Sequence, residues 1–367
     1  MSKKIRVGIL FGGKSAEHEV SLQSAKNVAD AINKDKYEVS LIGIDKSGRW
    51  LLPNQSQFLL NESNPKLIKL NRENEQSVTL IPQSGGQLTN LTDEKSHTTI
   101  DVVFPILHAP FGEDGTVQGL LKLANIPFVG ASVLGSAIGM DKDVMKRLLR
   151  DAGIPVAKFL VFKKGDDTDF ETVSEELGMP AFVKPANLGS SVGVSKVKNK
   201  EEFEKAVSEA FQYDSKILVE EAIVGREIEC SVLGNQNPIA SVPGEILPNH
   251  EFYSYEAKYI DENGAKLKVP AEVSETVKQQ VQELAIKTFR TLECEGLGRV
   301  DFFLKENGEF VVIEINTIPG FTKISMYPRL WEASGISYTE LIDRLIQLAI
   351  ERFEREQGLK TSFDLGD

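Results

Sequence analysis

The segment from Gly298 to Gly320 constrains the fold more than any other stretch of this sequence, because it predicts a β-hairpin with a defined register. Two runs rich in Val, Ile and Phe, residues 299–305 and 309–316, flank the dipeptide Asn307-Gly308. Asn-Gly is the strongest short signal for a two-residue hairpin turn. We therefore expect Glu306 to lie opposite Glu309, and this pairing sets the register of both strands.

That register places polar residues on one face of the hairpin, because side chains alternate along a strand. The facing pairs are Asp301 with Glu314 and Arg299 with Asn316. The other face is expected to belong to the core, and its apolar residues are Val300, Phe302, Val311, Ile313 and Ile315.

The two facing carboxylates predict a bound cation. Like charges directly opposite each other on a sheet repel, and a cation between them removes the repulsion. The carboxylates of Asp301 and Glu314, with the amide oxygen of Asn316, form a hard oxygen set that suits Mg²⁺ or Mn²⁺ better than Zn²⁺. Mg²⁺ usually completes such a shell with substrate phosphates. The alternative is an exposed polar face that binds no ion.

Length and charge narrow the class of protein. A chain of 367 residues predicts two or three domains. The formal net charge of −12 argues against nucleic acid as a main partner. No apolar run approaches the roughly 18–20 residues of a membrane helix. A strand begins almost at the first residue, so no signal peptide is expected.

The two cysteines fit the same interpretation. Cys230 and Cys294 lack the spacing of metal ligands, and we expect two buried free thiols in a reducing compartment. The expectation is therefore a soluble cytoplasmic protein without membrane insertion.

The N-terminal part reads as a doubly wound α/β domain. Residues 5–11 and 37–44 are predicted strands, and an amphipathic helix over 19–32 connects them. A further strand over 101–107 ends at His108. Ligands of open α/β sheets bind beyond the carboxyl ends of the strands, where we expect Glu19 and His108.

One motif in this region supports a competing hypothesis. Residues 8–15, Gly-Ile-Leu-Phe-Gly-Gly-Lys-Ser, match the pattern of a nucleotide-binding P-loop. The P-loop interpretation predicts a turn where Ile9, Leu10 and Phe11 instead resemble strand core. A P-loop nucleotide-binding module nevertheless remains the alternative from a different functional class.

Two later segments have the composition of ligand-contacting loops. The turn over 184–195 is rich in Gly and Ser, begins at Lys184 and can bring backbone N–H groups close to phosphate. Residues 243–268 are polar, contain three tyrosines and have no clear periodicity. A long loop of this kind is either a lid or a solvated insertion.

Taken in order, these motifs resemble the ATP-grasp carboxylate–amine ligases, and most closely the D-alanine–D-alanine ligase family. The matching stretches are residues 12–22, 108–119, 140–142, 182–196, 253–259, 298–302 and 314–322. The resemblance implies an α/β fold of three domains, with ATP held between the second and third. The expected boundaries are 1–130 for the N-terminal domain, 131–219 for the central one, and 220–367 for a C-terminal one with a lid near 243–268.

The resemblance also implies site residues. The metal ligands would be Asp301, Glu314 and Asn316. The ATP-binding residues would be Lys142, Lys184, Ser190, Ser191, Glu220, Ile223, Glu227 and Lys258. The D-alanine-binding residues would be Glu19, His108, Arg299, Ser325 and Met326. The residues closest to the chemistry would be Glu19, Ser190, Tyr259, Arg299, Gly320 and Ser325.

Several of these roles are specific. Glu19 would bind the ammonium of the first D-alanine, in a hydrogen-bonded set with Ser190 and Tyr259. Arg299 and the N–H of Gly320 would stabilise the oxyanion.

The implied reaction joins two D-alanines through a D-alanyl phosphate, for peptidoglycan precursors. It would use ATP with two Mg²⁺ or Mn²⁺ ions, in a homodimer. The same fold could instead join D-alanine to D-lactate or D-serine. Tyr259 favours an amine as second substrate, because relatives that make depsipeptides tend to carry Phe there.

Overall fold

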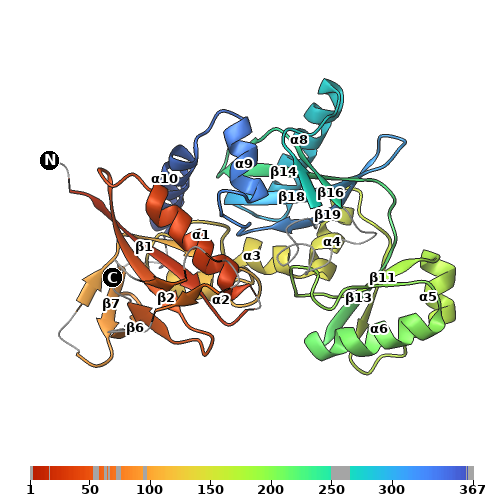
Figure 1. Cartoon of the computed structure of the whole chain (residues 1–367), viewed down its shortest axis with the longest axis horizontal. Helices are drawn as coiled ribbons and strands as arrows, with labels where there is room; N and C mark the ends of the chain where they lie inside the picture. The colour runs from red at the N-terminus through yellow and green to blue at the C-terminus, as the bar shows by residue number, and fades with distance from the viewer. Residues whose placement is uncertain are drawn as a thin grey trace.

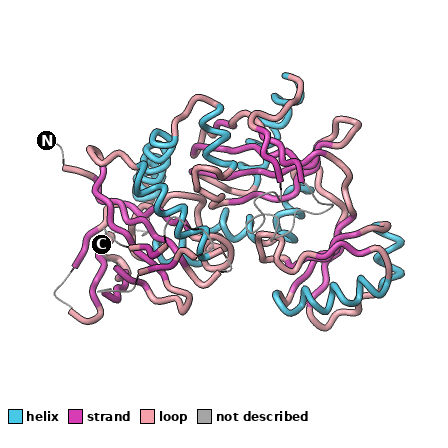
Figure 2. The backbone as a smooth tube through the Cα atoms, in the orientation of Figure 1, coloured by secondary structure: helices cyan, strands magenta, loops and turns pink. Residues whose placement is uncertain are grey.

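Three β-sheets follow one another along the long axis of the molecule (Figure 1). The computed structural model describes the chain except for residues 1–2, 16, 53–57, 62–63, 65–66, 72–75, 94–96, 249–264, 361 and 363–367. The N-terminal sheet lies at one end, a small sheet of the central segment at the other end, and a large sheet between them (Figures 1 and 2).

The N-terminal sheet is built on a parallel βαβ unit, as predicted. β1 (Ile5–Gly12) pairs in parallel with β2 (Tyr37–Ile44) and β9 (Val102–Ile106), and α1 (His18–Ala31) connects the first two. The sheet continues with antiparallel strands, which are β3 (Trp50–Leu52), β6 (Gln76–Leu80), β7 (Gln87–Asn90) and β8 (His97–Thr99). Beside it lie the short pair β4 (Leu59–Leu60) and β5 (Lys69–Leu70), and the helix α2 (Thr116–Leu123).

The P-loop interpretation of residues 8–15 is wrong. Residues 8–12 belong to β1, and Ile9, Leu10 and Phe11 are fully buried, so they cannot form a turn around a phosphate. Gly8 is a packing residue, since an added Cβ would lie 2.7 Å from a methyl carbon of Ile100.

The C-terminal helix returns to the N-terminal sheet. α10 (Tyr338–Gln357) contributes Leu341, Leu345 and Ala349 to the hydrophobic cluster that contains the inner side chains of β1 and α1. α9 (Met326–Ala333) adds Trp331 to the same cluster. Figure 1 shows α10, the last helix of the chain, beside α1. The first and last segments therefore share one core.

The small sheet has the order β10-β13-β11-β12 and is antiparallel. Its strands are β10 (Phe159–Lys163), β11 (Ala181–Pro185), β12 (Ser195–Val197) and β13 (Lys216–Glu221). α5 (Phe170–Leu177) and α6 (Lys200–Tyr213) pack on it. The predicted domain boundary at 219/220 falls inside β13.

The large sheet has the order β17-β16-β14-β18-β19, with β15 (Ile239–Ala240) beside β14. Its strands are β14 (Arg226–Gly234), β16 (Gly244–Pro248), β17 (Ala265–Lys268), β18 (Gly296–Leu304) and β19 (Phe310–Asn316). α4 (Lys142–Asp151) and α8 (Glu275–Thr291) supply its core partners, and α3 (Val133–Met140) lies against β19.

The hairpin β18–β19 confirms the predicted pairs at the site but not the predicted turn. Asp301 lies opposite Glu314 and Arg299 opposite Asn316. At the turn, however, Lys305 N donates to Glu309 O, so the connection has three residues rather than two. A register shift between Asp301 and Phe302 absorbs the difference, with Ile313 as the extra residue on β19.

This shift changes the predicted core face of β19. Val312 and Phe310 pair with Phe302 and Leu304 and lie in the core, together with Val300 and Ile315. Val311 is buried as expected, but it pairs with Phe303 and so lies on the other face, and Ile313 is only partly buried. The predicted core face of β19 is therefore wrong at these two positions.

The predicted lid begins and ends on paired strands. β16 and β17 pair antiparallel within residues 243–268. Residues 249–264 lie outside the described part of the chain, and Lys258 and Tyr259 are among them. No helix among the described residues is long and apolar enough to cross a membrane.

Candidate active site

The polar face of the β18–β19 hairpin is a compact ion-paired cluster. Arg299 binds Asp301 through two contacts, Nε to Oδ1 at 2.8 Å and Nη2 to Oδ2 at 2.7 Å. Its Nε also lies 2.9 Å from Oε2 of Glu229 on the neighbouring strand β14. Asn316 Nδ2 donates to Asp301 Oδ2 at 2.9 Å. Burial lowers the pKa of Arg299, but Asp301 and Glu229 more than compensate, and the pKa lies well above its usual value.

The donor set fits a hard divalent cation. Glu314 is a quarter exposed, with 24% of its side chain accessible, so one carboxylate faces an approaching ligand. Asp301 is engaged by Arg299, but a carboxylate has about four lone-pair positions and can also bind a metal. The described residues contain no group of three His, Cys, Asp or Glu side chains placed to hold a metal. Two carboxylates and one amide suit an ion that takes its other ligands from phosphate.

Lys142 connects the hairpin to the central segment. Its Nζ lies 3.4 Å from Glu314 Oε2 and donates to the carbonyl of Leu188 at 2.7 Å. Leu188 belongs to the Gly/Ser-rich turn. A predicted phosphate-binding lysine thus lies between a predicted metal ligand and the predicted phosphate-covering turn.

Glu220 lies between two lysines. Its Oε2 is 2.6 Å from Lys184 Nζ, and its Oε1 is 3.3 Å from Lys146 Nζ. Burial raises the pKa of Glu220, but the two ammonium groups outweigh it, and the pKa is lower than usual. Burial lowers the pKa of Lys146. Lys146 is a residue that the sequence analysis missed, although it follows Lys142 by four positions and so shares its helix face.

The predicted partner of Ser190 is wrong. Ser190 Oγ donates to Oε1 of Glu17 at 2.5 Å, and Glu17 is buried with 7% exposure. Glu19 instead forms an ion pair with Lys46 at 2.7 Å on the other side of the loop. Both acids lie in the segment Glu17-His-Glu19, but Glu17 is the N-cap residue of α1 and Glu19 lies in its first turn, and the two contact different partners.

The Gly/Ser-rich turn has an unusual backbone. Ser190 and Ser191 have φ of 53° and 58°, in the left-handed region that L side chains seldom adopt. Such strain persists where the surroundings over-determine the conformation, and it concentrates at ligand sites. The contact of Ser190 with Glu17 is one such constraint, and it joins the central segment to the N-terminal one.

His108 and Glu113 hold the loop after β19. His108 Nδ1 lies 2.9 Å from the carbonyl oxygen of Ile318, so Nδ1 carries the proton and donates. Glu113 accepts from the N–H of Ile318 at 3.0 Å and from the N–H of Ala109 at 2.7 Å. Burial lowers the pKa of His108, which is therefore neutral. Burial, with the nearby charge of Glu17, raises the pKa of Glu113 to about 8. Glu113 was also missed by the sequence analysis.

Ser325 lies next to Gly320. A Cβ on Gly320 would lie 3.0 Å from Ser325 Oγ, so a larger residue there would require the serine side chain to shift slightly. Ser325 precedes α9, and its Oγ lies 2.8 Å from Thr322 Oγ1. The side chain of Met326 packs against Ile246 in a hydrophobic cluster, which leaves only its backbone for a substrate contact.

The remaining predicted residues are less informative. Ile223 is partly buried between β13 and β14, and Glu227 lies in β14 opposite Phe303. Cys230 and Cys294 are buried free thiols, as expected, and burial raises the pKa of each to about 12.

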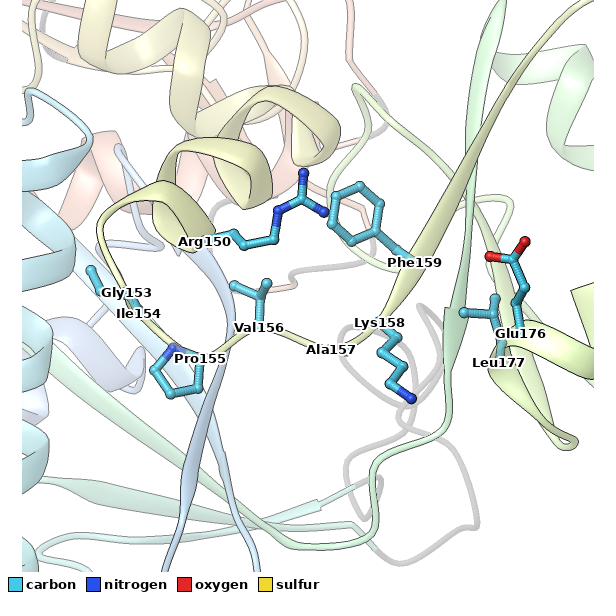
Figure 3. A pocket seen from close by; sticks show the side chains of 10 residues that line it. All are labelled: Arg150, Gly153, Ile154, Pro155, Val156, Ala157, Lys158, Phe159, Glu176 and Leu177. Carbon is cyan, nitrogen blue, oxygen red and sulfur yellow. The ribbon is translucent and has the colours of Figure 1, made fainter.

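Two cavities differ in their relation to these residues. One of about 210 Å³ is lined by the loop after β1 and by His108. Another, of about 500 Å³, follows the linker from α4 to β10 (Figure 3). Arg150 faces the ring of Phe159 there, with 5.8 Å between guanidinium carbon and ring centroid. This larger cavity contains no residue predicted to take part in the reaction.

Two family models match successive parts of this chain. Residues 6–131 match the family model described as D-ala D-ala ligase N-terminus, and residues 148–347 match the model described as D-ala D-ala ligase C-terminus. The chain is 60% identical over 361 residues to a D-alanine–D-alanine ligase of Oceanobacillus iheyensis, covering 98% of this chain and 99% of that protein.

Solved structures agree. The D-alanine–D-alanine ligase from Coxiella burnetii has a TM-score of 0.86 at 42% identity, covering 97% of each chain. The ligase from Bacillus anthracis, in a structure complexed with ATP, has a TM-score of 0.73 at 29% identity, covering 97% of this chain and 100% of that one. These neighbours confirm the predicted α/β ATP-grasp fold. The chain therefore belongs to the D-alanine–D-alanine ligase family.

Proposed function

We propose that this chain is an ATP-dependent D-alanine–D-alanine ligase that supplies the dipeptide for peptidoglycan precursors. The observation that carries the proposal is the meeting of three sets of residues from three sheets. The hairpin carries Arg299 and the acids, α4 and β11 carry the lysines, and the Gly/Ser-rich turn contacts Glu17.

The first half-reaction needs a carboxylate to act as nucleophile on the γ-phosphorus of ATP. The carboxylate of the first D-alanine forms a bond to phosphorus, and ADP leaves. Glu17, in place of Glu19, is the acid that we assign to the ammonium of this D-alanine, because it is buried and bonded to Ser190. Lys142 and Lys184 neutralise charge on the phosphates, which is the main protein contribution to phosphoryl transfer.

The second half-reaction is attack of an amine on the acyl phosphate. The amine of the second D-alanine adds to the carbonyl carbon, phosphate is expelled, and the nitrogen loses a proton. Arg299 and the N–H of Gly320 stabilise the oxyanion between these events. One such donor is worth roughly 3–4 kcal/mol of transition-state stabilisation. Ser325 and the backbone of Met326 are assigned to the carboxylate of the second D-alanine.

Asp301, Glu314 and Asn316 are the residues that we assign to two Mg²⁺ or Mn²⁺ ions. When bound, such ions supply charge neutralisation at the transferring phosphoryl group. The double variant Asp301→Asn/Glu314→Gln is expected to keep its fold and lose Mg²⁺-dependent turnover. Near-normal turnover would contradict the ligand assignment.

Other assignments rest on the resemblance alone. Glu220 and the backbone at Ile223 are assigned to adenine, Glu227 to the ribose, and Ser191 to the phosphate-covering turn. Lys258 is assigned to the transferred phosphate and Tyr259 to the set around the first D-alanine. We further propose that residues 243–268 act as a lid, that the enzyme is a homodimer and that it works in the cytoplasm.

Release of ADP with D-alanine as the sole amino acid tests the function. We expect turnover without any other acceptor, and a product whose mass equals that of D-alanyl-D-alanine. Turnover that begins only after D-lactate or D-serine is added would assign the chain to those reactions instead. Each acceptor should also be supplied alone as a control, because neither is expected to support turnover without D-alanine.

A further inference from the structure

Lys146 is a fully buried lysine that the proposed mechanism does not use. It lies on α4, one helical turn after Lys142, and has 0% exposure. Its Nζ makes no hydrogen bond of good geometry among the described residues, although Glu220 Oε1 lies 3.3 Å away. A buried ammonium in this state is costly, so a reason for its presence is needed.

The stability of the folded protein does not explain why a lysine is buried at this position. Replacing one member of a buried ion pair usually destabilises, but an apolar pair of similar volume is often as stable as the ionic one. Met has nearly the shape of Lys and would fill the same space. The same helix face also carries Lys142 toward Glu314. Through these two lysines, α4 therefore forms an ion pair with Glu220 of the small sheet and another with Glu314 of the large sheet.

The surroundings of Glu220 show what Lys146 does. Glu220 is 5% exposed, and its second oxygen is bonded to Lys184 at 2.6 Å. In the proposed function Lys184 binds the nucleotide phosphates. If Lys184 were the sole counter-ion of Glu220, its movement to the phosphates would leave a buried carboxylate without a partner. The free-energy cost of leaving the Glu220 carboxylate buried and unpaired would weaken nucleotide binding.

We propose that Lys146 is a positioning residue of the nucleotide site. It keeps a positive charge beside Glu220 and so holds this carboxylate next to the adenine ring, while Lys184 is free to bind the phosphates. This inference rests on the proposed function, in which Glu220 meets the adenine. Lys146 never touches ATP in this scheme. It acts through Glu220 alone.

The test compares Lys146→Met, Glu220→Gln and the double variant. Binding of Mg²⁺-ADP and Mg²⁺-GDP to the full-length protein is measured by calorimetry. We expect Lys146→Met to weaken ADP and GDP each about tenfold, because both nucleotides draw Lys184 to their phosphates and leave Glu220 without a cation. Glu220→Gln should instead weaken ADP more than GDP, because only adenine presents an amino group to Glu220. In the Glu220→Gln background the additional effect of Lys146→Met should vanish, since contacting residues are not additive.

Lys216→Met is the matched control. Lys216 also joins β13 to α4, through Asp141 at 2.6 Å and Asp143 at 3.1 Å, but it does not contact Glu220. Its removal should lower thermal stability without weakening the binding of either nucleotide. Chemical denaturation of each variant separates loss of fold from loss of binding.

The possible outcomes distinguish a wrong assignment of Glu220 to adenine from a wrong role for Lys146. If Glu220→Gln leaves the ADP to GDP ratio unchanged, the assignment of Glu220 to adenine fails with the proposed function. If Glu220→Gln changes the ratio but Lys146→Met leaves the affinity for both nucleotides unchanged, the role of Lys146 is overturned alone. An effect of Lys146→Met that persists undiminished in the Glu220→Gln background also overturns it.

Discussion

At the scale of single residues, the pair Glu17 and Glu19 illustrates what a motif leaves open. Both acids stand in one short stretch, and nothing in their spacing tells which one faces the site. The structure separates them: Glu17 bonds to Ser190, and Glu19 pairs with Lys46. Glu17→Gln should lower kcat/KM for D-alanine by 100-fold or more, on the order of 3 kcal/mol for a lost buried charge contact.

Glu19→Gln is the control for that experiment. Its ion pair is substantially exposed, with 64% of the Lys46 side chain and 37% of the Glu19 side chain accessible. Exposed pairs are worth about 0–1 kcal/mol, so turnover should stay within a few-fold of the parent. A larger loss in Glu19→Gln than in Glu17→Gln, in steady-state kinetics with varied D-alanine, would restore the original assignment.

Glu113 predicts how stability depends on pH. Its pKa is about 8 in the folded protein, against 4.5 as the ordinary value. A carboxyl with a raised pKa favours the folded state while it is protonated, and this contribution declines as pH rises from about 4.5 through about 8. One pKa unit is worth about 1.4 kcal/mol, so the effect on the free energy of unfolding should exceed 1 kcal/mol.

The measurement is urea unfolding of the parent and Glu113→Gln, at pH 5 and pH 8.5 with EDTA present. Glutamine keeps one acceptor oxygen and cannot ionise. The parent should lose more stability than the variant between the two pH values. Equal losses would mean that Glu113 titrates normally.

At the scale of elements, the sequence predicted the β18–β19 hairpin correctly at the pairs Asp301–Glu314 and Arg299–Asn316, but not at its turn. Asn307-Gly308 and the alternating apolar residues on either side of it correctly predicted a hairpin. A two-residue turn without a bulge and a three-residue turn with a bulge give the same pairs at Asp301. The sequence cannot distinguish the two, because Val and Ile occur on both faces of β19. The core face was therefore misplaced by one residue beyond the bulge.

The turn can be tested through Gly308. Its φ is +85°, and a Cβ built there would meet no atom within 4 Å, so any cost of a substitution is conformational. Gly308→Ala should lower the free energy of unfolding by about 1 kcal/mol, and Gly308→Asn by less, because Asn tolerates the left-handed region. ADP release should be unchanged in both. Equal stability of the Gly and Ala proteins would contradict the positive φ.

At the scale of the whole molecule, the motifs predicted an ATP-grasp fold but not how distant segments of the chain pack together. The apolar pattern of residues 338–353 fits a helix but does not indicate which part of the fold that helix packs against. α10 turns back onto the N-terminal sheet, where Arg352 donates to the carbonyls of Phe128 and Gly130. Its guanidinium carbon also lies 4.5 Å from the ring centroid of Phe128. Such contacts join residues more than 200 positions apart, and local periodicity carries no trace of them.

This packing makes the N-terminal part of the site dependent on the end of the chain. α10 buries Leu341, Ile342, Leu345, Ile346 and Ala349. Burial of each larger side chain stabilises by roughly 1.5–3 kcal/mol, so their removal approaches the whole 5–15 kcal/mol of a typical domain. A chain that ends before Tyr338 should therefore lose the cooperative unfolding transition seen by circular dichroism. A chain that ends at Gly358 keeps all of α10 and should unfold like the parent. The shorter chain could instead keep a cooperative unfolding transition and measurable turnover. In that case the N-terminal sheet folds without α10, and the core that the two share is dispensable.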